Sequence, residues 1–144
     1  MKMSTKGRYG LRLMLDIALN SGEKPVALKD VAARQEISEK YLEQIIIKLS
    51  KAELVRGTRG ARGGYVLARK PEDISVGDIL RVVEGNLSPV DCAECSGQSI
   101  CARADSCITI DLWRDIKLAV ESVVDNRSLA DLTASYHRKN PENK

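Results

Sequence analysis

The feature that most constrains the fold is a pair of amphipathic segments separated by a short turn. Residues 28–35 and 38–51 each repeat apolar residues at helical spacing, and only Glu36 and Ile37 stand between them. Ser38 begins the second segment, and a serine there can cap the first backbone N–H groups of a helix. A short helix, a tight turn with a buried Ile and a longer helix match the helix-turn-helix layout, whose second helix enters the major groove of DNA. The pattern predicts a nucleic-acid-binding domain.

A basic, glycine-rich segment follows directly. Residues 53–68 indicate a strand, a glycine-rich turn and a second strand. Between Arg56 and Lys70 lie five Lys or Arg and no Asp or Glu. No fold requires that imbalance, whereas a nearby phosphate backbone explains it. A solvated hairpin is the alternative, but its position after a helix-turn-helix favours a wing that contacts DNA.

The candidate DNA-binding residues lie on the second helix and at the tip of the wing: Ser38, Lys40, Tyr41, Glu43, Gln44, Arg59, Gly60 and Arg62. Gln44 can bond an adenine edge, Glu43 can accept from a cytosine amino group, and Lys40 can donate to guanine or phosphate. Arg59 and Arg62 can enter a minor groove or clamp phosphates, and Gly60 allows close backbone approach. Partial burial is the alternative for Tyr41, and pairing with Lys40 or Lys48 is the alternative for Glu43. Only Lys40 and Gln44 are expected to stand clearly outward.

The remaining pattern predicts a mostly α fold. Aromatic residues make up 3% of the chain and Phe is absent, so the core must use Leu, Ile, Val and Ala, which favours helices. Further helices are expected over 4–20, from 75 to about 83, from 112 to 124, and from 128. The stripe from Leu112 to Val124 is too apolar for one small monomer to cover, so it predicts a homodimer seam.

These elements predict four regions within 144 residues. Residues 1–85 form a winged helix-turn-helix domain and residues 86–108 a cysteine-rich loop. Residues 109–134 form a long C-terminal dimerisation helix and a short helix, and residues 135–144 form a flexible tail. The first region carries 16 Lys or Arg against 11 Asp or Glu, whereas residues 86–144 carry 7 against 9. No segment is long and apolar enough to cross a membrane or resembles a signal peptide, so we expect a cytoplasmic protein.

All four cysteines, Cys92, Cys95, Cys101 and Cys107, lie in one 16-residue window without an apolar period. In a reducing cytoplasm such clustering favours metal or redox chemistry over structural disulfides. Structural zinc usually uses two close Cys pairs, and only Cys92 and Cys95 form one. The wider spacing of the others favours an iron-sulfur cluster. A thiol redox switch is the next alternative, followed by zinc.

Enzymatic chemistry is not expected. The single histidine, His137, lies in a polar segment, and the chain has no Walker loop, no GxGxxG and no Ser/His/Asp set. We therefore expect no small-molecule substrate.

Several motifs together resemble one known family: Met3-Ser4-Thr5-Lys6-Gly7-Arg8-Tyr9, Met14-Leu15-Asp16-Ile17-Ala18-Leu19-Asn20, Ser38 with Tyr41-Leu42-Glu43-Gln44, Arg59-Gly60 with Gly63-Gly64-Tyr65, and Leu112-Trp113-Arg114-Asp115. Up to about Leu132 the chain resembles the winged-helix regulators typified by IscR, the iron-sulfur cluster regulator. The cysteine-metabolism repressor CymR and the nitric oxide sensor NsrR are relatives of that type. The resemblance implies a homodimer on palindromic promoter DNA, with the long helix crossing over the partner and a cluster loop before it.

The resemblance also implies roles for single residues. Cys95, Cys101 and Cys107 fall on the family's three-cysteine ligand spacing, and Glu43, Gln44 and Arg59 fall on its DNA-reading positions. We expect a [2Fe–2S] cluster, with [4Fe–4S] as the alternative.

The fourth ligand is where this sequence departs from the family. The IscR type has a His three residues after its last cysteine, where this chain has Ile110. The NsrR type borrows an acidic residue from the other subunit's N-terminal helix, where this chain reads Gly7-Arg8-Tyr9. Cys92 belongs to neither pattern and is the nearest remaining thiolate, so we expect it to be the fourth ligand. A free Cys92, with water, a small thiol or a partner-chain donor completing the site, is the alternative.

The sequence therefore favours a dimeric transcriptional regulator on a pseudo-palindromic operator, expected to repress iron-sulfur cluster assembly genes under control of a cluster. One alternative is a cluster-free, CymR-like repressor of sulfur and cysteine metabolism, controlled by a partner protein or by thiol oxidation. Another, from a different class, is a zinc-bound interaction module with an incidental wing.

Overall fold

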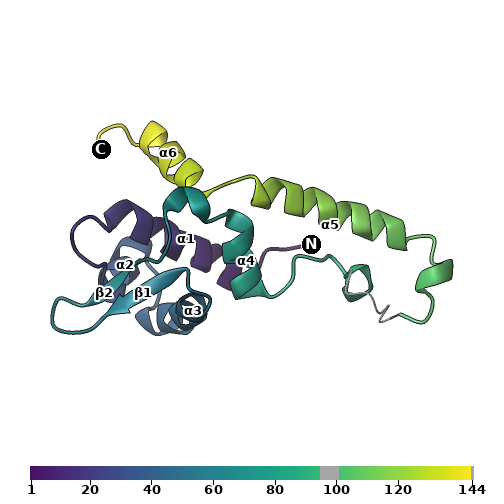
Figure 1. Cartoon of the computed structure of the whole chain (residues 1–144), viewed down its shortest axis with the longest axis horizontal. Helices are drawn as coiled ribbons and strands as arrows, with labels where there is room; N and C mark the ends of the chain where they lie inside the picture. Colours follow the sequence, from purple (N-terminus) through teal and green to yellow (C-terminus); the bar gives the residue numbers. More distant parts are fainter. Residues whose placement is uncertain (95–100, 144) are drawn as a thin grey trace.

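Helices from both ends of the chain surround one apolar core (Figure 1). The structure is a computed structural model that describes residues 1–94 and 101–143. The part that precedes the cysteines contains α1 (Thr5–Asn20), α2 (Leu28–Gln35), α3 (Glu39–Lys51), β1 (Val55–Thr58), β2 (Gly64–Leu67), the 3-10 turn η1 (Pro71–Asp73) and α4 (Val76–Glu84). Their apolar faces meet in a core of Leu, Ile, Val and Met side chains that are at most 5% exposed. We call these elements, together with α6 (Leu129–Lys139), the body.

Side-chain caps explain where the helices begin. The Ser4 hydroxyl accepts a hydrogen bond from the Gly7 amide, and Ser38 accepts one from Tyr41. Ser75 and Asp78 form a complete capping box at the start of α4. Each serine satisfies a backbone N–H group that has no partner within its helix. The predicted starts of these three helices are confirmed.

The turn between α2 and α3 has the predicted buried isoleucine. Glu36 adopts the left-handed conformation with φ of 53°, which ends α2 and reverses the chain. Ile37 then points into the core, 5% exposed. This places α3 across α2 and α1, which is the helix-turn-helix layout that the sequence predicted.

The two strands form an antiparallel hairpin whose second strand is held by the segment before α2, close to the turn. Val55 pairs with Leu67 at one end of the register and Thr58 with Gly64 at the other. Tyr65 also exchanges two backbone hydrogen bonds with Val26, at N···O distances of 2.8 and 2.9 Å. At Gly64, a Cβ atom would lie 2.4 Å from the Val26 carbonyl oxygen, so only glycine permits this close approach. The hairpin, or wing, is therefore held in position by the segment around Val26.

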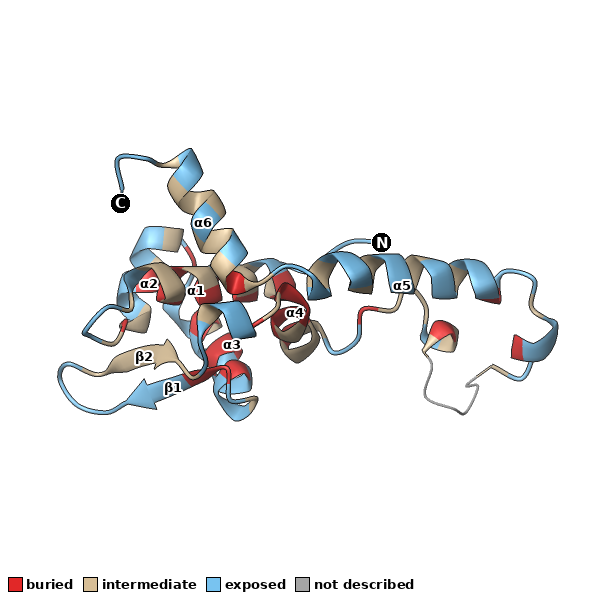
Figure 2. Cartoon of the chain, turned by 45° about the horizontal axis from the view of Figure 1, so that its top comes forward, coloured by how far each residue is buried: buried red, intermediate tan, exposed pale blue. Residues whose placement is uncertain are grey.

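A long helix leaves the body as an arm. α5 (Ile110–Asp125) is almost entirely pale blue or tan in Figure 2, whereas most of the red buried segments lie in the body. Leu112 is 52% exposed and Val123 is 64% exposed. Two short 3-10 turns, η2 (Asp91–Ala93) and η3 (Ala104–Ser106), lie in the cysteine segment before the arm. None of the described helices is long and apolar enough to span a membrane.

The C-terminal helix is longer than the sequence predicted. α6 continues to Lys139, so the prediction of a flexible tail from residue 135 is wrong for residues 135–139. A capping box formed by Ser128 and Asp131 starts the helix, and Leu129 is fully buried in the core of the body. Arg138 and Lys139 occupy the last turn, where their positive charges interact favourably with the negative end of the helix dipole. Packing against α1, which the sequence pattern does not show, extends the helix.

Candidate nucleic-acid interface and cysteine segment

One face of α3 is polar and exposed. Leu42, Ile45, Ile46 and Leu49 are buried, as their spacing predicted, while Lys40, Glu43 and Gln44 are exposed on the opposite side. No ion pair joins Glu43 to Lys40 or Lys48 in α3, all of which the structure describes. Glu43 therefore stands outward with Lys40 and Gln44, which corrects the expectation that only those two do.

Tyr41 is half-buried because it packs on α1. Its ring meets the ring of Tyr9 edge-on, with 5.6 Å between centroids and an interplanar angle of 83°. The Arg12 guanidinium lies 5.5 Å from the centroid of the Tyr9 ring. Arg12 Nε also donates a 3.1 Å hydrogen bond to Oε1 of Gln35 at the end of α2. These contacts fix α3 relative to α1 and α2, so its exposed face keeps one orientation.

A buried carboxylate joins α1 to α2, and the sequence analysis did not identify it. Asp16 is 2% exposed, and its oxygens accept from Arg34 Nη2 at 2.6 Å and from Gln35 Nε2 at 2.8 Å. The hydrogen bond to Asp16 raises the pKa of the Arg34 guanidinium above its ordinary value. A polar residue at a core position of an amphipathic helix is the sequence signal for such a pair.

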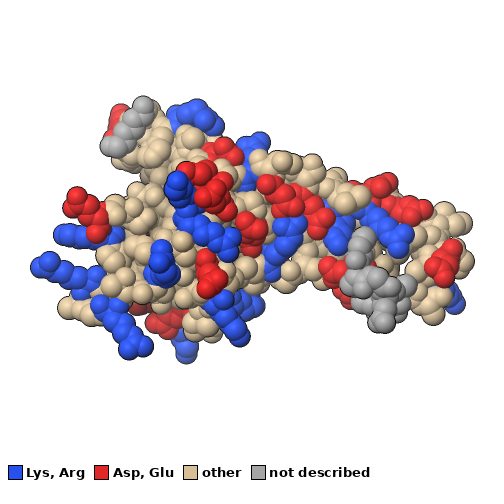
Figure 3. Space-filling model, in the orientation of Figure 1, with Lys and Arg blue, Asp and Glu red and all other residues tan. Residues whose placement is uncertain are grey.

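The tip of the wing presents two arginines. Arg59 and Arg62 are exposed, and Gly60 between them has a φ of 107°, a backbone conformation that favours glycine. Gly63 N–H closes the turn by donating to the Gly60 carbonyl at 2.9 Å. Lys and Arg side chains project from the end of the body that carries the wing (Figure 3). The predicted residues on α3 and on the wing thus belong to one body that is held together by the contacts above.

The cysteine segment is described only in part. Cys95 lies outside the described residues. Cys92 in η2 is half-buried, Cys101 precedes η3, and Cys107 lies three residues before α5. Within residues 1–94 and 101–143, no three His, Cys, Asp or Glu side chains come together as a metal site. The described part therefore does not assemble the predicted set of four thiolates.

The surroundings of Cys107 favour its thiolate form. Cys107 Sγ lies 3.4 Å from Oγ1 of Thr109, and this hydrogen bond together with the Thr109 backbone lowers the pKa of the Cys107 thiol. Thiolates are the ligands that iron-sulfur clusters and zinc take from cysteine. The donor chemistry of this segment therefore fits a soft metal centre. Ile110, which stands at the position of the IscR-type histidine, is buried at the start of α5 and offers no donor atom.

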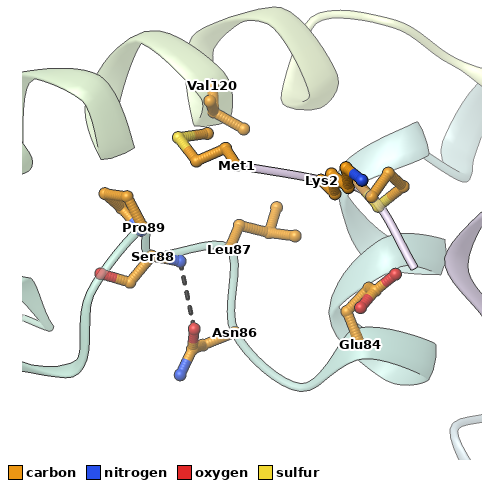
Figure 4. Close-up of a pocket in the computed structure, with 9 residues that line it drawn as sticks. Met1, Lys2, Glu84, Asn86, Leu87, Ser88, Pro89 and Val120 are labelled. Carbon is orange, nitrogen blue, oxygen red and sulfur yellow. Dashed lines mark hydrogen bonds between the residues drawn. The ribbon is translucent and has the colours of Figure 1, made fainter.

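The cysteine segment is attached to both the arm and the body. Glu94 accepts from Asn86 within the segment at 2.8 Å and forms an ion pair with Lys117 of α5 at 3.8 Å. Leu87 of the segment packs with Val76 and Leu80 of α4. Near by, Glu84 at the end of α4 accepts from the hydroxyl of Ser4, the N-cap of α1, at 2.6 Å. Figure 4 shows the cavity of about 360 Å³ at this junction, lined by Met1, Leu87, Pro89 and Val120 among others. The junction links the cysteine segment to the start of α1.

Comparison with known proteins gives a consistent result. A family model described as "Rrf2: Iron-dependent Transcriptional regulator" matches residues 3–135. The transcriptional regulator CymR of Bacillus subtilis is 46% identical over 136 residues, 94% of this chain and 91% of that protein. The transcriptional regulator IscR of Aliivibrio salmonicida is 44% identical over 132 residues, 92% of this chain and 77% of that protein. These relatives are named as transcriptional regulators and not as enzymes.

Solved structures agree with the sequence relatives. The structure of "T. potens IscR" superposes with a TM-score of 0.78 at 42% identity, covering 97% of this chain and 91% of that chain. The structure of CymR from B. subtilis, the "Global Cysteine Regulator", superposes with a TM-score of 0.76 at 43% identity, covering 94% and 98%. The fold is the winged helix-turn-helix predicted from the sequence. IscR and CymR are similar to this chain to nearly the same degree.

Proposed function

The chain belongs to the Rrf2 family of transcriptional regulators, and on that premise we propose that it binds duplex DNA through α3 and the wing and responds to an iron-sulfur cluster in its cysteine segment. The observation that carries the DNA-binding part is the pairing of an exposed polar face on α3 with exposed arginines on an anchored wing. Repression of iron-sulfur cluster assembly genes remains the expected outcome of that binding.

In this proposal α3 lies in the major groove. Gln44 reads an adenine edge, Glu43 accepts from a cytosine amino group, and Lys40 contacts guanine or phosphate. Ser38 and Tyr41 contact the phosphate backbone beside the first turn of the helix. The Tyr9–Tyr41 contact and the Arg12–Gln35 hydrogen bond hold the exposed face of α3, here called the reading face, in place. Little conformational entropy is therefore lost when this face binds DNA.

The wing reaches the adjacent backbone or minor groove. Arg59 and Arg62 supply the positive charge, and Gly60 lets the main chain come close to the phosphates. The pairing of β2 with Val26 supports this role because it holds the hairpin close to its turn.

The functional form is a homodimer that reads a pseudo-palindrome. Exposed apolar side chains along α5 support this, since Leu112, Leu118 and Val123 all remain more than half exposed in one chain. Two symmetric α3 helices would then lie about one DNA turn, roughly 34 Å, apart.

The cluster is held by Cys95, Cys101 and Cys107, with Cys92 as the fourth ligand. Bound there, a [2Fe–2S] cluster, or a [4Fe–4S] cluster as the alternative, supplies sensitivity to iron supply and redox state. The lowered thiol pKa of Cys107 supports ligation by its thiolate. The packing of Leu87 on Val76 and Leu80 of α4, and the hydrogen bond from Ser4 to Glu84, connect the segment through α4 to α1 and so to the exposed face of α3.

Anaerobic purification tests the cluster. We expect iron, sulfide and visible absorption in the purified chain, and a different DNA affinity after the cluster is removed. Cys101→Ala should lose the cluster. Cys92→Ala should alter its spectrum and reduction potential, since a thiolate ligand is replaced. If Cys92→Ala keeps the wild-type spectrum, potential, and iron and sulfide content while Cys101→Ala loses its cluster, the all-cysteine site is wrong.

A cluster-free regulator is the second candidate, supported by the near-equal similarity to CymR. It predicts a colourless protein that binds DNA without iron and changes affinity with a partner protein or with thiol oxidation. A zinc-bound interaction module, the third candidate, predicts stoichiometric zinc and no specific duplex binding. Metal analysis and the visible spectrum of one anaerobic preparation separate all three.

A further inference from the structure

α3 contains three consecutive isoleucines with opposite environments. Ile45 is 1% exposed and Ile46 is 2% exposed, because both point into the core of the body. Ile47 is 65% exposed. The core therefore accounts for two of the three, and the third needs another explanation.

Ile47 stands in the middle of the polar reading face. At about 100° of rotation per residue, it lies within roughly 60° of arc of Glu43 and Gln44 and between Lys40 and Lys51 along the helix. Lys40, Glu43, Gln44, Lys48 and Lys51 are all exposed. An isoleucine is the one apolar side chain among these five polar neighbours.

We propose that Ile47 reads a thymine by packing against its 5-methyl group, which makes it a specificity-determining residue of the operator contact. This inference rests on the proposed binding of α3 in the major groove. Within that groove the base edges present hydrogen-bonding groups, and the thymine methyl is the apolar group that they offer. Ile47 can form no hydrogen bond with its side chain and gains nothing from a phosphate, so the methyl group is the partner that its chemistry fits.

The position along the helix supports the same partner. Glu43 and Gln44 precede Ile47 by four and three residues, so the three side chains reach neighbouring base pairs from one helix face. Hydrogen-bonding side chains and an apolar contact would then define consecutive positions of each half-site.

Replacing thymine by deoxyuridine tests this directly, because the substitution removes the methyl group and leaves every hydrogen-bonding group in place. The probe is the duplex most strongly enriched by the full wild-type chain from a random duplex pool. Each dT in one half-site is replaced in turn by dU. We expect one position at which dU weakens binding by about fourfold, the effect of losing one buried methyl-sized group.

Variants at Ile47 identify the side chain responsible. Ile47→Ala should weaken binding to the dT duplex by a similar factor and lose its sensitivity to dU at that position, whereas Ile47→Val should keep the sensitivity. The slope of affinity against salt should stay unchanged, because no charge is altered. Ala favours helix more than Ile and position 47 is outside the core, so the variants should fold, which circular dichroism checks.

The outcomes separate this inference from the function on which it rests. Wild-type binding that tolerates dU within twofold at every position would overturn the role of Ile47 and leave DNA binding intact. Sensitivity to dU that survives in Ile47→Ala would also overturn it, since another side chain would then read the methyl. If the wild-type chain enriches no duplex, DNA binding itself fails and the role of Ile47 fails with it.

Discussion

The apolar side chains of the body are buried, whereas several of those on the arm are exposed. In the body, side chains such as Leu13 and Leu42 are fully buried by neighbours from the same chain. On the arm, Leu112, Leu118 and Val123 remain more than half exposed. The amphipathic pattern of α5 is as regular as that of α3, so the difference lies in what covers it. The apolar faces of the body helices cover one another, whereas the apolar face of the arm needs a second chain to cover it.

The two regions also differ in how they are held. The helices of the body are joined by the Ser4–Glu84 hydrogen bond, by the Asp16–Arg34 ion pair and by one shared core. The arm joins the body at one end, where Val120 and Val124 pack on α4 and Arg81 pairs with Asp125. The body is therefore held by contacts within itself, whereas the arm is held to the body at one end only.

The largest expected effect is on assembly. Replacing Leu112 and Val123 together by Asp places two charges in the proposed dimer seam, where burial of an unpaired charge costs several kcal/mol. We expect a monomer at micromolar concentration, in which the body unfolds at nearly the wild-type temperature. Sedimentation and thermal unfolding measure the two effects. Ala134→Asp, an exposed change on α6, is the matched control and should stay dimeric. A double variant that sediments as a dimer would place the seam elsewhere.

Truncating a core side chain of the body should instead lower the stability of the body. Leu42→Ala removes a fully buried side chain from α3 and should lower the free energy of unfolding by about 2–5 kcal/mol. The matched truncation on the arm is Leu118→Ala, which removes the same atoms from a side chain that is 61% exposed. In the monomeric background of the Leu112→Asp, Val123→Asp variant, where no second chain covers it, the change should alter the free energy of unfolding by less than about 0.5 kcal/mol. Denaturant titrations of the two variants compare the regions directly, and equal losses would contradict the division into body and arm.

The proposed DNA contacts all lie on the body, so their loss should weaken binding without affecting the arm. Arg59→Ala should weaken specific binding by about 1–3 kcal/mol, the range for a good groove contact. Lys51→Ala should have a smaller effect that fades with added salt, as expected of a phosphate contact. Both residues are exposed, so neither change should affect folding. An Arg59→Ala variant that folds and binds with unchanged affinity would remove the wing from the reading surface.

Local signals made the body predictable. Ser4, Ser38 and Ser75 mark helix starts through bonds to residues three positions away, so the sequence alone shows them. The extension of α6 to Lys139 depends on packing against α1, which local spacing does not contain. Helical spacing leaves Ile47 out of the buried stripe of α3, but it does not show what the exposed side chain contacts.

The candidate site also has one part that local sequence predicts and one part that it does not. The DNA-reading residues lie on one helix and one turn, so helical periodicity and glycine-rich turn chemistry place them. The predicted cysteine site requires a long segment to close on itself and includes Cys95, which lies outside the described residues. Its ligand set depends on contacts between residues distant in sequence and on a cofactor, neither of which residue spacing specifies.

The smallest expected effect concerns the joint between the two regions. Arg81 Nη1 and Nη2 donate to the two carboxylate oxygens of Asp125 at 2.6 and 2.9 Å, and these bonds lower the pKa of Asp125 below its ordinary value of 3.8. Both side chains are more than a third exposed, so solvent screening keeps the pair to about 1 kcal/mol or less. Because the folded-state pKa is depressed, this stabilisation is present above pH 3.8 and is lost as the pH falls through the folded-state value.

Asp125→Asn tests the joint without changing the shape of the side chain. We expect a small loss in the free energy of unfolding near neutral pH, measured by denaturant titration, and a loss that shrinks as the pH falls below 3.8. Ser122→Ala, an exposed change one turn earlier on α5, is the control and should show no such pH dependence. The dimer should persist in Asp125→Asn, because the apolar seam and not the ion pair holds the second chain. A variant that falls apart into monomers would instead make the joint part of the interface, and the arm could no longer be treated as separate from the body.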